Sequence, residues 1–317
     1  MSVLDIRRDG PVVTASLNNP PFNFLTAELV FELGRLLDMV EADPGVRAVV
    51  IASAVPDTFI SHYDIAEILQ GAERVGLSLG PRLVGVGIRA VDALRRIPGL
   101  RQALEHTPAA GITALLRYHD VTRRMRRSSA VFVAAVSGMA LGGGCELALA
   151  CDIRLMAEGP YGIGQPEVLL GLFPGGGGTQ ILTRTLGVGR AIQLVVEGKP
   201  LSPIEALEVG LVHRLVRGEE LLDEAQFTAA RLATRAPAAV EAIKRAVYHY
   251  GSRPIDKGLA FERARFLSLA TRHDTKNALG TYVGLVEQHT NGGQGVVTFA
   301  EQHLPDLLAG TTAEFVP

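Results

Sequence analysis

The hydrophobic positions change their spacing along the chain, and each spacing predicts a different kind of element. Residues 131–136 form an uninterrupted apolar run, which is typical of a strand buried on both faces of a sheet. Residues 3–17 alternate and are split by Asp9-Gly10, which predicts a hairpin. Residues 28–40 have helical spacing and follow Thr26, a residue suited to cap a helix. Shorter strands are expected at residues 46–52 and 59–60.

Helical spacing dominates the later part of the chain. Ser202, followed by Pro203 and Glu205, is a typical helix start. No internal repeat or long linker interrupts the order, and the tail after Asn291-Gly292-Gly293 has no pattern that predicts an element. The other helices expected here cover residues 187–199, 219–249 with a break at Pro237, 255–270 and 275–287.

The stretch from Ala130 to Gln180 contains most of the residues with a candidate chemical role. Ser137-Gly138 ends the apolar strand, and Gly142–Gly144 lead into a short helix-forming segment, Cys145–Cys151. A helix that begins behind a glycine turn presents unpaired backbone N–H groups and the positive end of its dipole. Such a junction binds an anion or stabilises an oxygen that gains negative charge.

Two glutamates lie within this stretch. Glu146 stands at the start of the helical segment, and Glu167 follows Gln165-Pro166, 21 positions later. That separation is too long for one helix face, so only the tertiary fold can bring the two carboxylates together. Taken alone, Glu146 is explained by stabilisation of the helix dipole and Glu167 by an ordinary surface position.

Three segments in and after this stretch resemble the crotonase superfamily, and most closely its enoyl-CoA hydratases: GMALGGGCELALACDIRLMAE, GQPEVLLGLFPGGGGTQILTRTLG and GKPLSPIEALEVGLVHRLV. The resemblance covers about residues 3–70 and 120–270. It implies an α/β fold, in which a crotonase spiral of repeated β-β-α turns forms a core domain over residues 1–200. A helical C-terminal region, residues 201–317, would follow, through which such proteins assemble as homotrimers or dimers of trimers.

The resemblance also implies a reaction, the hydration of a 2-enoyl-CoA to a 3-hydroxyacyl-CoA. Glu167 would protonate the α-carbon, and Glu146 would position and activate the water. The backbone N–H groups of Tyr63 and Gly143 would form the oxyanion hole. Coenzyme A enters as part of the substrate, and neither a metal nor another cofactor is expected. The further substrate-binding positions that the resemblance implies are Ser61, His62, Asp64, Ile65, Gly142, Pro166 and Gly175.

Two features depart from the family's pattern. His62 and Tyr63 stand where small residues are usual in the first oxyanion loop, which changes the shape of the neighbouring pocket but leaves the backbone N–H of Tyr63 able to donate. Residues 71–118 take the place of a much shorter connection. Helical spacing at residues 83–97 and 112–127, separated by Pro98-Gly99 and Thr107-Pro108, predicts an inserted helical hairpin. It would line the acyl pocket, serve as a lid or contact another subunit.

Composition narrows the class of protein. The 317 residues are 47% hydrophobic and 20% charged, with a formal charge of −2, which indicates a soluble globular protein and gives no electrostatic argument for nucleic-acid binding. Glycines interrupt the longest apolar run, so no membrane span is expected. The start lacks the character of a signal or transit peptide, which makes the cytoplasm the expected location. Cys145 and Cys151 are expected as small core residues.

Other functions and roles stay open at this stage. Isomerisation of a double bond would use the same oxyanion hole, but two retained glutamates favour hydration, because moving a proton between carbons needs only one. A non-catalytic acyl-CoA-binding or assembly protein is the alternative from another class. The basic run Arg123–Arg127 is either a solvated helix end or an attraction for the phosphates of coenzyme A. Gly175–Gly178 lacks the sequence of a phosphate loop and is expected to allow tight backbone packing beneath the site.

Overall fold

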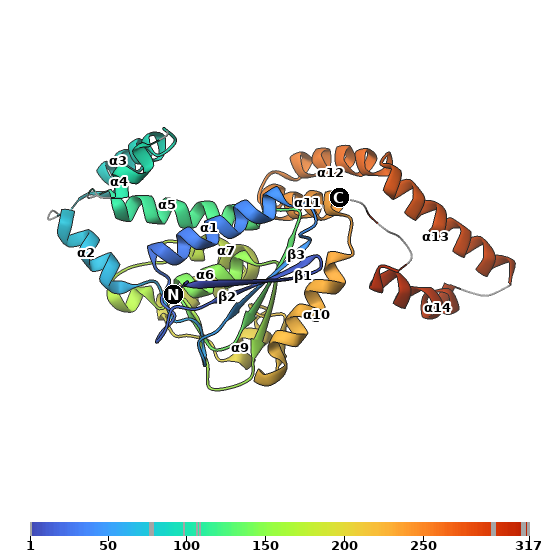
Figure 1. The fold of residues 1–317 in the computed structure, drawn as a ribbon, viewed down its shortest axis with the longest axis horizontal. Coiled ribbons are helices and arrows are strands. Elements are labelled where there is room, and N and C mark those ends of the chain that lie inside the picture. The colour runs from blue at the N-terminus through green and yellow to red at the C-terminus, as the bar shows by residue number, and fades with distance from the viewer. Residues whose placement is uncertain are drawn as a thin grey trace.

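The computed structural model describes residues 2–75, 79–97, 99–105, 107, 109–292, 296–311 and 315. Two sheets lie at its centre and helices surround them (Figure 1). The strands are β1 Leu4–Asp9, β2 Val12–Leu17, β3 Ala48–Ser53, β4 Thr58–Ile60, β5 Val131–Val136, β6 Met139–Leu141, β7 Ile153–Ala157, β8 Ile163–Gly164 and β9 Arg214–Val216.

Strands of the two sheets alternate along the middle of the chain. The larger sheet has the order β1-β2-β3-β5-β7-β9, in which β1 and β2 form the expected antiparallel hairpin and the other neighbours are parallel. The smaller sheet, β4-β6-β8, is parallel throughout. From β3 to β8, each strand of the larger sheet is followed along the chain by a strand of the smaller one, and helices follow. This arrangement is the expected spiral of β-β-α turns.

The central strands of the larger sheet are buried on both faces, as their continuous apolar sequences predict. On β5, Phe132, Ala134 and Val136 belong to one core cluster, while the alternate residues Val131 and Val133 belong to a second. The alternation follows from the two-residue repeat of a strand. The first cluster holds the buried side chains of α1 and α6, and the second those of α10. Both faces of the sheet are therefore covered, which is typical of parallel sheets.

Helices make up most of the remaining chain. The expected break before Pro237 and the expected helix over residues 255–270 are confirmed. The helices are α1 Ala27–Ala42, α2 Ile65–Val75, α3 Pro81–Leu94, α4 Leu100–Glu105, α5 Ala110–Met125, α6 Gly143–Ala150, α7 Gly178–Leu186, α8 Val188–Glu197, α9 Pro203–Glu208, α10 Leu221–Ala233, α11 Pro237–Arg245, α12 Ile255–Ala270, α13 His273–Asn291 and α14 Val296–Ala309, with 3₁₀ turns at Glu167–Leu170 and Gly218–Glu220 and a π-helical turn at Ala246–Tyr250.

Local capping explains where several helices begin. The hydroxyl of Thr26 accepts a hydrogen bond from the N–H of Leu29, as expected for the cap of α1. At α9, Ser202 accepts from the N–H of Glu205, whose carboxylate accepts from the N–H of Ser202 in return. These starts are set by neighbouring residues, so the sequence alone predicts them.

The inserted segment forms more helices than the expected hairpin. The two expected helices are present as α3 and α5, but α2 and α4 lie beside them. Pro98 and Pro108, two of the expected breaks, lie outside the described residues. Helix α5 packs along α1, and Arg124 at its end pairs with Asp38 and Glu41 of α1. Arg124 therefore lies at a helix end and pairs with α1, while an attraction of Arg123–Arg127 for the phosphates of coenzyme A stays a prediction.

The C-terminal part of the chain contributes to the core as well as to the outer helices. Strand β9 pairs with β7, and α10 covers one face of the larger sheet. The boundary between domains at residue 200 stays a prediction. Helix α14, which follows α13, was not predicted from the sequence (Figure 1). Within the described residues, no helix has the length and apolar character needed to cross a membrane.

Candidate active site

Glu146 lies on the first turn of α6 with its side chain buried. Its Oε1 atom accepts two backbone hydrogen bonds, from the N–H of Gly178 at 2.8 Å and from the N–H of Gly176 at 2.7 Å. Burial raises the pKa of Glu146 to about 7; the two N–H groups oppose this rise, and the nearby charge of Glu167 adds to it. A carboxyl group with a pKa near neutrality is suited to proton transfer.

The glycine run before α7 is required by the space that Glu146 occupies. A Cβ atom at Gly176 would lie 2.2 Å from Oε2 of Glu146 and 2.3 Å from Cε1 of Tyr118. At Gly178, a Cβ atom would lie 2.7 Å from the side-chain amide of Gln165. The expected tight backbone packing is thus confirmed. The two hydrogen bonds that these glycines donate to a carboxylate were not predicted.

Glu167 begins the 3₁₀ turn that follows Pro166 and is half-buried. With its amide oriented to satisfy both groups, the buried Gln165 donates to the two carboxylate oxygens of Glu167 at 2.9 and 3.2 Å. Burial raises the pKa of Glu167 above its ordinary value. A Cβ atom at Gly142 would lie 2.9 Å from Oε1 of Glu167, so this carboxylate lies directly against the glycine turn.

The two expected oxyanion donors lie next to each other. The backbone of Leu25 bridges the first loop by accepting from the N–H of Asp64 and donating to the carbonyl of His62. This pattern leaves the N–H of Tyr63 between them without an acceptor in the described part of the chain, and the same holds for the N–H of Gly143 at the start of α6. A Cβ atom at Gly143 would lie 3.7 Å from the backbone nitrogen of Tyr63.

The turn before α6 depends on glycine. Gly142 has a φ of +50° and a ψ of −116°, a conformation that residues with a Cβ rarely adopt. At Gly143, a Cβ atom would lie only 2.7 Å from Cδ2 of Leu25. Both positions therefore need glycine to bring the backbone close to the first loop.

The side chain of Tyr63 is held by a hydrogen bond to Glu67 of α2. Its hydroxyl donates to Oε2 of Glu67 at 3.0 Å, and the same oxygen accepts from the N–H of Ala27 at the start of α1. Burial and the charge of Glu67 raise the pKa of Tyr63 above its ordinary value. His62 Nδ1 lies 2.8 Å from the carbonyl oxygen of Tyr63, and its ring packs against Phe24. Side chains larger than those usual in the family are accommodated by these contacts.

The remaining substrate-binding candidates have local structural contacts. Ser61 donates to the carbonyl of Phe22 at 2.6 Å. Asp64 accepts from the N–H of Ala66 and so caps a turn, and Ile65 starts α2 with 38% of its surface exposed.

Two candidates lie beside the second glutamate and the glycine run. Pro166 directly precedes the 3₁₀ turn of Glu167. Gly175 is exposed, and its carbonyl lies 2.7 Å from Nε2 of His119. The structure therefore holds the chain at Gly175 through α5, a contact that the sequence did not predict.

Tyr118 of α5 is a site residue that the sequence did not reveal. Its fully buried hydroxyl donates a 2.6 Å hydrogen bond to the carbonyl oxygen of Gly143. Burial, together with the charge of Glu146, raises the pKa of Tyr118 well above its ordinary value, so the hydroxyl keeps its proton. Tyr118 lies at the end of the inserted segment and has no local motif that would have singled it out.

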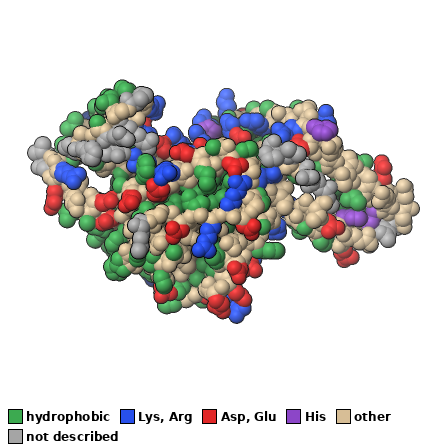
Figure 2. Space-filling view, in the orientation of Figure 1, with side chains coloured by type: hydrophobic (Ala, Val, Ile, Leu, Met, Phe, Trp, Pro, Cys, Tyr) green, Lys and Arg blue, Asp and Glu red, His purple; other side chains and the backbone are tan. Residues whose placement is uncertain are grey.

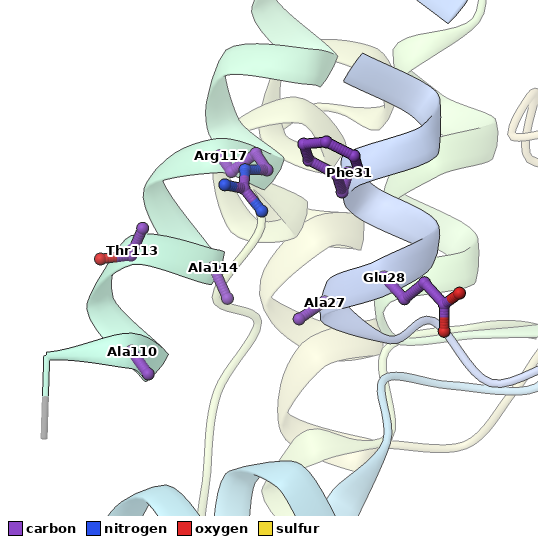
Figure 3. Close-up of a pocket in the computed structure, with 7 residues that line it drawn as sticks. All are labelled: Ala27, Glu28, Phe31, Ala110, Thr113, Ala114 and Arg117. Carbon is purple, nitrogen blue, oxygen red and sulfur yellow. The ribbon is translucent and has the colours of Figure 1, made fainter. Parts of the chain in front are cut away.

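A cavity of about 310 Å³ lies between α1 and α5, next to the site (Figure 3). The guanidinium of Arg117 stacks on the ring of Phe31, 5.1 Å from its centroid. The inserted segment thus contributes one wall of a cavity through α5, and α1 contributes the other. The lining residues are Ala27, Glu28, Phe31, Ala110, Thr113, Ala114 and Arg117.

Cys145 and Cys151 are both buried with free thiols, which confirms them as small core residues. Among the residues that the structure describes, no group of three or more His, Cys, Asp or Glu side chains is arranged to hold a metal ion.

Comparison with known proteins agrees with this geometry. A sequence profile described as enoyl-CoA hydratase/isomerase matches residues 7–79 and 101–291. The chain is 34% identical over 279 residues to a probable enoyl-CoA hydratase of Rhizobium meliloti, covering 88% of this chain and 93% of the relative. It is 31% identical to the short-chain-enoyl-CoA hydratase of Clostridium acetobutylicum, with the same coverage of 88% and 93%.

A solved structure shows the same fold. The enoyl-CoA hydratase of Bacillus anthracis superposes with a TM-score of 0.71 at 27% identity, covering 89% of this chain and 96% of that one. The profile match extends over most of the chain, including both glutamates and the two glycine turns. The chain belongs to the enoyl-CoA hydratase/isomerase family, within the crotonase superfamily.

Proposed function

We propose that the protein hydrates a 2-enoyl-CoA thioester to the 3-hydroxyacyl-CoA. The observation that carries the proposal is the meeting of three distant segments at one glycine turn. Glu167 lies against Gly142, the N–H of Tyr63 lies beside Gly143, and Glu146 follows on the same helix turn. Family membership and the names of the relatives supply the substrate class.

The environment of Glu146 supports a role in holding and activating water. Its Oε1 atom is fixed by two backbone N–H groups, whereas no group of the described residues donates to Oε2. That second oxygen is available to accept a proton from a water molecule. Because Glu146 is buried and its pKa is raised toward neutrality, proton transfer to it near pH 7 is energetically accessible.

Glu167 is proposed to protonate the α-carbon. Its raised pKa favours the protonated acid that this step needs, and Gln165 holds the carboxyl group in place. Addition of water to C3 places a negative charge on the thioester oxygen, which the N–H groups of Tyr63 and Gly143 would stabilise. Proton transfer from Glu167 to C2 then completes the 3-hydroxyacyl product.

The remaining expectations are part of the same proposal. Coenzyme A enters as part of the substrate, and the chemistry drawn here uses only side chains and backbone groups of this chain. A homotrimer or dimer of trimers and a cytoplasmic location are also proposed. Exposed apolar residues on α8, with Val188, Ile192 and Val196 between 59% and 71% exposed, support burial of that helix against another subunit.

The test is loss of the conjugated enoyl-thioester absorbance with crotonyl-CoA and with a longer 2-enoyl-CoA. The wild-type protein should hydrate at least one of them, and Glu146→Gln and Glu167→Gln should each lose most of the rate while still binding acyl-CoA. Glu219→Gln, at a side chain that is 72% exposed, is the matched control and should keep the wild-type rate.

Two other results would assign a different function to the protein. Conversion of a 3-enoyl-CoA to the 2-enoyl isomer without hydration would assign the protein to isomerisation. Tight binding of acyl-CoA with no change in either substrate would assign it to the non-catalytic class.

A further inference from the structure

A second cavity, of about 410 Å³, lies where α7 meets the end of α5 and the junction before α12. Polar and charged side chains from these elements form most of its wall. The lining residues are Arg126, Gln180, Ile181, Arg184, Tyr248, His249, Ser252 and Arg253, here named the arginine cavity. Lys and Arg side chains also gather on this edge of the molecule, over α11 and the start of α12 (Figure 2).

The arginine cavity has positive charge without a matching carboxylate. Arg126, Arg184 and Arg253 all line it, and no Asp or Glu is among the lining residues. Within the described part of the chain, none of these three arginines forms an ion pair. Other clustered arginines of this protein, such as Arg95 and Arg124, do face an acid.

Two of the arginines are held in place by uncharged partners. Arg184 donates from Nε to the hydroxyl of Ser252 at 2.7 Å and from Nη1 to the carbonyl of Gln180 at 2.6 Å. Arg253 Nη2 lies 3.2 Å from Nε2 of His249. These contacts use only part of each five-donor guanidinium, so further N–H groups remain available to an anion.

Arg126 has the strongest indication of a missing partner. Its guanidinium lies over the ring of Tyr248, 4.4 Å from the centroid, and its Nε atom is buried without a hydrogen-bond acceptor. A buried, unpaired charged donor is costly, and such groups are usually satisfied by a bound species.

The nearest acid is already fully engaged. Asp152 accepts from Nζ of Lys244 and the N–H of Phe132 on one oxygen, and from the hydroxyl of Tyr248 on the other. Its charge is already paired with Lys244.

The arginine cavity is separate from the candidate active site. Helix α7 begins at Gly178, which donates to Glu146, and Arg184 lies six residues further along the helix. Six residues correspond to about 9 Å along a helix axis. The cavity lining runs along α7 from Gln180 to Arg184, and neither Glu146 nor Glu167 is among the lining residues.

We propose that the arginine cavity binds a phosphate group, either inorganic phosphate or the phosphate of a small ester. Planar guanidinium groups make paired hydrogen bonds to phosphate oxygens. Three positive groups suit the double negative charge of a phosphate better than the single charge of a carboxylate. Ser252 and Gln180 add uncharged polar groups to the wall, and the ring of Tyr248 provides a flat face beside the anion. The proposal is independent of the hydratase activity.

The test is calorimetric titration of the full-length protein with inorganic phosphate and with AMP, at constant ionic strength set by chloride. Wild-type protein should bind at least one of them with a stoichiometry of one per chain outside the active site. Arg253→Gln should weaken binding by about tenfold, since one charge-assisted pair is removed. Arg253→Lys, which retains charge but lacks the planar fork, should lie between the two.

The controls separate a site from general charge attraction. Arg253 is exposed, so its variants are expected to fold, and the thermal midpoint without phosphate checks this. Arg7→Gln removes an exposed arginine from β1 and should leave binding unchanged. Tighter binding of AMP than of phosphate would assign the site to an ester, and equal binding to free phosphate. The proposal would be overturned if titration with phosphate and with AMP released no more heat than titration with chloride. Equal binding by the wild type and Arg253→Gln would overturn it as well.

Discussion

The hydroxyl of Tyr118 and the carbonyl of Gly143 are joined by a buried hydrogen bond of 2.6 Å. Tyr118 comes from α5 at the end of the inserted segment, whereas Gly143 starts the helix that carries Glu146. The insertion therefore holds the backbone of the proposed oxyanion hole through a hydrogen bond to the carbonyl of Gly143. A change in this segment is expected to affect the proposed chemistry without contacting the substrate.

Tyr118→Phe tests this support directly. Removing the hydroxyl leaves a buried carbonyl without its partner, which is expected to cost about 1–3 kcal/mol. If Gly143 shifts as a result, the hydration rate should fall by about tenfold while acyl-CoA binding changes less. Urea unfolding and initial rates measure the two effects. Tyr161→Phe, which loses a hydrogen bond to the exposed Asp57, is the control, and an equal loss of rate there would refute a specific role for Tyr118.

Gly176→Ala tests the packing against Glu146. The added methyl group would lie 2.2 Å from Oε2 of Glu146, so either the carboxylate or the loop must move. We expect a loss of about 1–3 kcal/mol in stability and of most of the hydration rate. Gly189→Ala on α8, where a Cβ atom meets nothing within 4 Å, should keep the wild-type rate and should not lower the stability. A Gly176→Ala enzyme with the wild-type rate would contradict the proposed role of this loop.

The raised pKa of Glu146 predicts a pH dependence of stability. Burial raises this pKa from 4.5 to about 7, so the folded state binds more protons than the unfolded state between these values. The contribution is fully present below about pH 4.5 and is lost as the pH rises through about 7, by roughly 3 kcal/mol. Glu146→Gln removes this titration.

Thermal midpoints at pH 5, 6, 7 and 8 measure the effect. The midpoint of Glu146→Gln minus that of wild type should rise with pH over this range. For Glu219→Gln, at an exposed position, the same difference should stay flat. A flat difference for both variants would show that Glu146 titrates at its ordinary pKa.

Lys244 connects α11 to the core. We therefore predict that replacing it lowers the free energy of unfolding, although it lies far from the site. Its buried Nζ donates to the carbonyls of Met125 and Ala130 and pairs with Asp152 at 2.7 Å. Lys244→Met would leave Asp152 without its counter-charge, which is expected to cost about 3–5 kcal/mol. Lys199→Met, at a surface pair with a 70% exposed lysine, should cost less than about 1 kcal/mol in the same urea unfolding experiment. Similar losses for both variants would contradict the importance of burial.

Prediction from the sequence was most accurate where neighbouring residues decide the structure. The Thr26 cap, the Ser202–Glu205 capping pair and the helix over residues 255–270 depend on contacts within one turn or on a regular apolar repeat. The helices α2, α4 and α14 were not predicted from the sequence.

The sequence by itself determined most of the elements, the family resemblance and the two glutamates with their glycine turns. It determined them because strand and helix periodicity, capping and glycine turns are properties of short segments. Only the tertiary structure decided that Gly176 and Gly178 donate to Glu146, that Tyr118 holds Gly143, and that three arginines surround a separate cavity. These contacts join residues 25 to more than 100 positions apart, and their geometry depends on how the packed layers bring the segments together.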